Sequence, residues 1–88
     1  MLRLYHVRVK GDYAPEIAPC AGDSIWFTSR FDSWIGLLNA EGEVVHFNLP
    51  PNFHDLGGLH TISCRELLFV ANFSVANANE RHLFSLSI

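Results

Sequence analysis

The chain carries little charge, and none of it is concentrated. Only 17% of its 88 residues are Asp, Glu, Lys or Arg, and its formal net charge is -3. A protein that binds the phosphate backbone of a nucleic acid needs lysines and arginines gathered on one surface. Here the six basic residues are scattered singly, at Arg3, Arg8, Lys10, Arg30, Arg65 and Arg81. The sequence therefore argues against nucleic-acid binding.

Long apolar runs are also missing. No stretch approaches the roughly 20 apolar residues that a membrane-spanning helix requires. A secretory signal needs a basic start followed by an apolar run of about 7–15 residues. At this N-terminus Arg3, His6 and Arg8 interrupt the apolar residues. We therefore expect no membrane association and a cytoplasmic location.

Cysteine is scarce, with Cys20 and Cys64 alone in the sequence. In the reducing cytoplasm two such thiols stay free, so we expect no disulfide between them. Sequence motifs for chemistry are missing as well. The chain contains no Cys-x-x-Cys, His-Glu-x-x-His, Gly-x-Ser-x-Gly or phosphate-binding glycine loop. We expect a protein that is not an enzyme and holds no cofactor.

Apolar residues are plentiful, at 49% of the chain. Such a composition can build a core, and the length fits one domain over residues 1–88. With few charges to cover the outside of so small a domain, some apolar surface stays exposed. Exposed apolar patches usually mark contacts with other chains. The composition therefore predicts a protein partner or a homo-oligomer.

Short runs of strand-forming residues alternate with turn-forming clusters along the chain, a pattern typical of all-β sandwiches and barrels. The strictest alternation is at the C-terminus, where apolar residues at 84, 86 and 88 alternate with serines at 85 and 87. We expect an antiparallel β-sandwich of six to eight short strands. The expected strands lie near residues 3–9, 16–18, 25–28, 34–38, 43–49, 60–64, 66–75 and 81–88, with a loop between 49 and 60.

Two helical alternatives compete with parts of this fold. Ser63 and Glu66 have the spacing of a capping box, so a helix from about Cys64 would give an α+β fold. A shorter helix could likewise begin at Asp32 or Ser33 and end before Gly42. The aromatic and β-branched residues between 69 and 75 favour strands over the longer helix.

The stretch PEIAPCAGDSIWFTS, residues 15–29, resembles the strand entry of cupredoxin-like sandwiches. This resemblance implies a similar topology. It does not carry the copper site, which in that family takes a cysteine, a histidine and usually a methionine from one loop near the C-terminus. Here no cysteine follows Cys64, the only methionine is Met1, and the terminal strand carries His82 alone.

The stretch from residue 49 to residue 64 carries the best candidates for metal ligands, which are His54, His60 and Cys64, with Asp55 next to His54. A zinc or copper ion needs three or four such ligands at about 2.0–2.3 Å. On a strand, His60 and Cys64 lie more than about 10 Å apart, so we expect no metal there. The alternatives are a metal or small-ligand site on these residues, and a nucleophilic role for Cys64 beside a histidine.

Four aromatic residues cluster between positions 26 and 34. Trp26, Phe31 and Trp34, together with Arg30, are of the types that dominate protein-binding hot spots. Since Trp26 and Phe27 point to opposite faces of one strand, we expect one of the two at the surface. We predict protein contacts or self-association through Trp26, Arg30, Phe31 and Trp34. Accessory, regulatory or inhibitor proteins of bacteria and phages are of this class. Sugar stacking on an exposed tryptophan is a further alternative.

Overall fold

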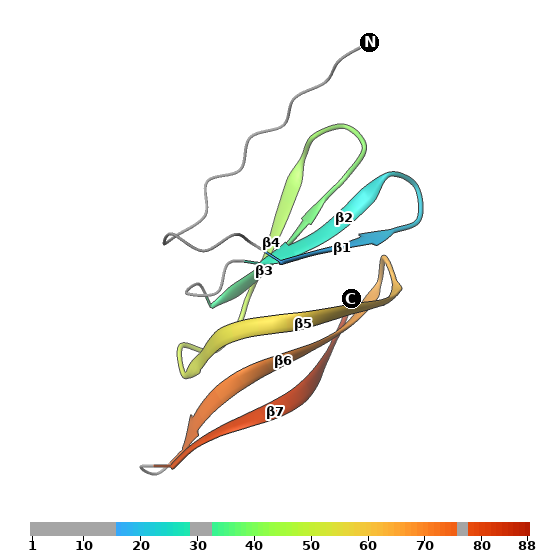
Figure 1. The fold of residues 1–88 in the computed structure, drawn as a ribbon. Coiled ribbons are helices and arrows are strands. Elements are labelled where there is room, and N and C mark those ends of the chain that lie inside the picture. The colour runs from blue at the N-terminus through green and yellow to red at the C-terminus, as the bar shows by residue number, and fades with distance from the viewer. Residues whose placement is uncertain (1–15, 29–32, 76–77) are drawn as a thin grey trace.

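The computed structural model describes residues 16–28, 33–75 and 78–88, and within these ranges it contains seven β-strands and no helix (Figure 1). The strands are β1 (Glu16–Cys20), β2 (Ser24–Thr28), β3 (Trp34–Leu38), β4 (Val44–Asn48), β5 (Phe53–Ser63), β6 (Glu66–Val75) and β7 (Ala78–Ser87). They form a four-stranded sheet in the order β1-β2-β3-β4 and a three-stranded sheet in the order β5-β6-β7. The prediction of a small antiparallel all-β fold is confirmed.

Both helical alternatives are wrong. Residues 34–38 form β3, and Cys64 and Arg65 form a tight turn that leads into β6. The reason is the alternation of side chains: Leu67, Phe69 and Ala71 are buried on one face of β6, an arrangement that only a two-residue period provides. The described residues therefore include no helix that could cross a membrane. The expected strand at residues 3–9 lies outside the described ranges.

The expected loop before His60 is also wrong, because β5 already begins at Phe53 and runs for eleven residues. Its glycine pair suggested a loop, but Gly57 still pairs with Val70 of β6. The irregularity that the glycines signal is a set of register shifts along β5, with positive φ at Asp55 and Gly58. These residues therefore mark bulges within a strand rather than the end of one.

Tight turns set the register of the four-stranded sheet. The turn between β3 and β4 is closed by the Asn39 side chain, whose carbonyl oxygen accepts hydrogen bonds from the backbone N–H groups of Glu41 and Glu43. Gly42 follows with a φ of 84°, a backbone conformation that is unfavourable for residues with a Cβ. The hairpin predicted around residues 39–42 is confirmed.

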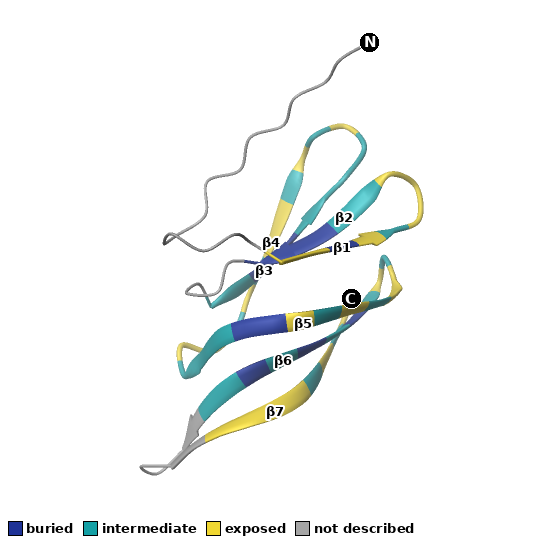
Figure 2. Ribbon diagram, viewed as in Figure 1, coloured by how far each residue is buried: buried dark blue, intermediate teal, exposed yellow. Residues whose placement is uncertain are grey.

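The core lies between the two sheets (Figure 2). Trp26 and Ile35 of the four-stranded sheet are fully buried, as are Leu67 and Ala71 of the three-stranded sheet. Phe69, at 2% exposed, belongs to the same cluster. Each sheet therefore has one face toward the core and a second face turned away from it.

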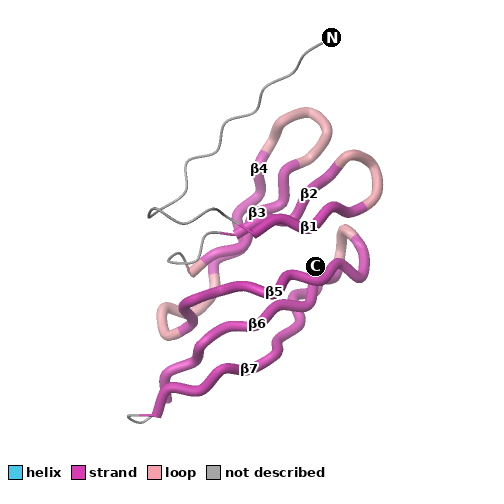
Figure 3. Tube along the Cα trace, viewed as in Figure 1, coloured by secondary structure: helices cyan, strands magenta, loops and turns pink. Residues whose placement is uncertain are grey.

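The two sheets meet where β1 lies beside β5 (Figure 3). Cys20 at the end of β1 and Cys64 in the turn after β5 form a disulfide, with their Cα atoms 5.3 Å apart. This corrects the prediction of two free thiols, which was drawn from an expected compartment and not from geometry. The Trp26 indole Nε1 donates a hydrogen bond of 3.0 Å to the carbonyl oxygen of Ser63, next to the same bridge. We call this region, with Cys20, Cys64, Trp26 and Ser63, the sheet junction.

Loss of the disulfide should lower stability markedly. The bridge joins residues 44 positions apart, and closing so long a loop restricts the unfolded chain strongly. We expect the double variant Cys20→Ser/Cys64→Ser to lose about 2–4 kcal/mol of unfolding free energy, measured by urea denaturation. Reductant should lower the midpoint of the natural chain toward that of the double variant and leave the double variant unchanged. Equal midpoints for both proteins without reductant would contradict this account of the sheet junction.

Candidate functional site

The face of the four-stranded sheet that points away from the core is the candidate site. Strand pairing places Ile17 opposite Phe27, Phe27 opposite Gly36, and Gly36 opposite His46. Directly paired residues share a face, so the whole set can be read from the register. We call this set the outer face, and its members are Ile17, Pro19, Ile25, Phe27, Trp34, Gly36, Leu38, Val44, His46 and Asn48.

The outer face contains no Asp, Glu, Lys or Arg, and most of its side chains are apolar. Ile17 is 64% exposed, while Trp34, Leu38 and Val44 are half-buried. In a two-layer sandwich, the residues that face away from the core along each strand are normally polar. An apolar face without charge is therefore the feature of this surface that indicates a binding role.

Aromatic side chains lie at the centre of the outer face. The rings of Trp34 and His46 meet edge to face, with centroids 4.7 Å apart. Phe27 packs against Trp34 in the same manner at 5.6 Å. Phe27 lies on the outer face and is only 6% exposed, and its ring lies over Gly36, where no Cβ stands in the way. The result is an anchored aromatic group with Trp34 and His46 at its accessible side.

Hydrogen bonds fix Trp34 at the start of β3. Its carbonyl oxygen accepts a bond of 2.9 Å from the Oγ1 of Thr28, a fully buried residue of β2. Just before it, Ser33 Oγ donates to the carbonyl oxygen of Phe53, and the Ser33 carbonyl accepts from the N–H of Leu49. The backbone that presents the tryptophan is thus held by three separate segments.

Two of the predicted contact residues are described by the structure, and of these Trp34 lies on this face. Trp26 is fully buried, so its prediction as a contact residue is wrong. Its polar N–H is satisfied inside the protein by Ser63, which removes the need for a surface position. Arg30 and Phe31 lie outside the described residues. Ile17 and His46 were missed, and they emerge only when the alternation in four strands is combined with their register.

The alternative that His54, His60 and Cys64 together hold a metal is wrong. Cys64 is bonded to Cys20, so it supplies neither a metal ligand nor a nucleophilic thiolate. His54 and His60 pair with Asn72 and Leu68 of β6, which puts the histidines about 13–14 Å apart along the sheet. Within the described ranges, no three His, Cys, Asp or Glu side chains gather in a way that could hold a metal ion.

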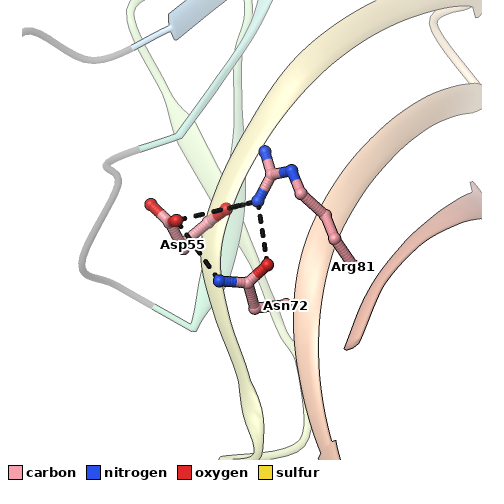
Figure 4. A network of polar contacts seen from close by, with 3 residues as sticks. All are labelled: Asp55, Asn72 and Arg81. Carbon is pink, nitrogen blue, oxygen red and sulfur yellow. Dashed lines mark hydrogen bonds and ion pairs between the residues drawn. The ribbon is translucent and has the colours of Figure 1, made fainter. Parts of the chain in front are cut away.

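Asp55 has a structural role instead (Figure 4). It has a φ of 55°, in a part of β5 where the register with β6 shifts. Arg81 Nη1 of β7 donates to the Asp55 carbonyl oxygen at 2.9 Å and to Asn72 Oδ1 at 3.2 Å, and it lies 3.7 Å from the Asp55 carboxylate. Asn72 Nδ2 donates to that carboxylate at 3.4 Å. The network ties a bulged segment of β5 to its neighbour β6 and, across β6, to β7.

Comparison with models of known protein families, with curated proteins and with solved structures gave no match for this chain. The resemblance of residues 15–29 to cupredoxin-like sandwiches therefore gains no support from solved structures.

The contact between Phe27 and Gly36 gives a test of the outer face. A Cβ at position 36 would lie 2.5 Å from Phe27 Cζ, so Gly36→Ala must displace the ring. We expect a loss of about 1–3 kcal/mol in unfolding free energy, typical of overpacking. In a Phe27→Ala background the same substitution should be nearly neutral. Equal effects in the two backgrounds, measured by denaturant titration, would show that the ring does not cover Gly36.

Proposed function

We propose that this protein is a non-enzymatic binding protein that contacts another protein through its outer face. The observation that carries the proposal is the apolar, uncharged character of that face, with Ile17 64% exposed on it. Burying apolar area contributes roughly 25 cal/mol per Å² to the binding free energy. Because no charge on this face would have to be desolvated, a partner with a matching apolar surface would lose little of that gain.

The aromatic group gives this contact its expected centre. Tryptophan is among the residues that most often dominate binding energy, and a ring already held in place loses little conformational freedom on binding. Trp34 is held by Phe27 on one side and by His46 on the other. An apolar sheet face of this kind suits a protein surface, in keeping with an accessory, regulatory or inhibitor role.

The disulfide bears on where this binding takes place. Structural disulfides persist in oxidising compartments and are rare in the cytoplasm. The Cys20–Cys64 bridge therefore favours an oxidising compartment over the cytoplasmic location that the sequence suggested. We propose that the protein meets its partner in such a compartment.

Sugar binding is the second candidate, and it rests on the same half-buried tryptophan. An indole on an apolar face can stack on the C–H side of a sugar ring. Titration of the protein with a panel of glycans, followed by tryptophan fluorescence, addresses this alternative. Trp34→Phe is the control, since Trp26 is buried and should not respond.

Replacing each tryptophan by alanine should separate binding from stability. Trp26→Ala removes a fully buried side chain and should lower the unfolding free energy by about 3–5 kcal/mol. Trp34→Ala should leave a folded protein that no longer retains the proteins captured from native extract by the natural chain. Ile62→Ala, at an exposed apolar residue on β5, is the matched control and should retain them. Unchanged capture by a folded Trp34→Ala would refute the proposal.

A further inference from the structure

Within the described ranges, β7 ends the three-stranded sheet with an open edge. Among the described strands only β6 pairs with it, although it is ten residues long. Much of its surface is exposed (Figure 2), including Leu83 at 67%. A long edge strand offers unpaired backbone N–H and C=O groups that another strand can bind.

The direction of these backbone groups follows from one hydrogen bond. The N–H of Ile88 donates to the carbonyl oxygen of Arg65, at the start of β6, over 2.9 Å. In an antiparallel pair the groups of successive residues point alternately to one side and the other. The pairing of β6 with β7 shows no register shift. The odd-numbered residues Arg81, Leu83, Ser85 and Ser87 therefore present N–H and C=O to the open edge.

The charged side chains of β7 that could oppose the addition of another strand are engaged in contacts within the protein. Proteins commonly protect edge strands with charged side chains that oppose strand addition. The Arg81 guanidinium instead reaches across β6 to Asn72 and Asp55 (Figure 4). Glu80 is engaged along its own strand by His82, with Oε2 and Nε2 2.7 Å apart. From Leu83 to Ser87 the strand carries no ionisable side chain.

We infer that β7 pairs antiparallel with β7 of a second copy of this chain, about a two-fold axis at Leu83. This register places the two Leu83 side chains opposite each other and covers the most exposed large apolar residue of the described chain. It sets Arg81 opposite Ser85 and Glu80 opposite Leu86, so no like charges face each other. An axis at Arg81 would oppose two cations, and an axis at His82 would oppose two imidazoles.

The pairing uses the backbone groups that the edge leaves open. Over residues 79–87 the odd-numbered residues of each copy meet one another and exchange about ten hydrogen bonds. Two three-stranded sheets then form one continuous sheet of six strands. The other edges fit less well, because β4 has only five residues and β5 lies against β1. We call this β7–β7 pairing the seam. It lies on a different sheet from the outer face, so it can be tested independently of the proposed function.

Cysteine cross-linking tests the register directly. In the inferred pair the two Leu83 Cα atoms lie about 5.5 Å apart, within the range that a disulfide spans. Leu83→Cys should form a covalent dimer under mild oxidation, with the link at position 83 found by peptide mapping. Ser85→Cys is the matched control on the same face. Its two copies would be about 13–14 Å apart and should not link. Equal linking by both variants, or by neither, would overturn the inference.

A second variant tests the association without new cysteines. The natural chain should sediment as a dimer, and Leu83→Lys, which sets two cations opposite each other, should sediment as a folded monomer with an unchanged circular-dichroism spectrum. Ile62→Lys introduces the same charge at another exposed apolar position and should remain dimeric. A monomeric natural chain at all concentrations, or a dimeric Leu83→Lys, would contradict the seam.

Discussion

The sheet junction is the constraint on which the rest of the structure depends. Two small sheets share one core, and Cys20 at the end of β1 is joined covalently to Cys64 in the turn after β5. The hydrogen bond from Trp26 to Ser63 fixes the largest core side chain beside the same bridge. A chain of 88 residues buries a limited fraction of its surface, so a cross-link between distant segments supplies stability that the core alone lacks.

This arrangement decides which surfaces are left for binding. The three-stranded sheet covers only the inner side of the four-stranded sheet, and the outer face keeps its apolar side chains away from that core. Trp26 and Phe27 show the division within two residues. The tryptophan fills the core, and the phenylalanine anchors the aromatic group of the outer face from a nearly buried position over Gly36. Core and proposed contact surface are therefore two sides of one strand.

Much of the fold could be predicted from the sequence, because two-residue alternation is a local signal. It located the strands around Ser24–Thr28 and Glu66–Val75, and Gly42 marked the hairpin turn. The disulfide could not be predicted in this way, since it joins residues 44 positions apart and depends on how two sheets meet. The β5 bulges were mistaken for a loop for a related reason: glycines signal irregular backbone without showing whether a partner strand continues beside it.

The candidate site was predicted only in part. Trp34 was found because its residue type is common in binding surfaces, while His46 needed the register of four strands. Trp26 was misassigned because a sequence shows that two neighbours face opposite sides but not which side is covered. The most direct test of the sheet junction is peptide mapping of the non-reduced protein together with a thiol count after denaturation. We expect a linked pair of peptides containing Cys20 and Cys64 and no free thiol. Two free thiols in the freshly purified protein would contradict it.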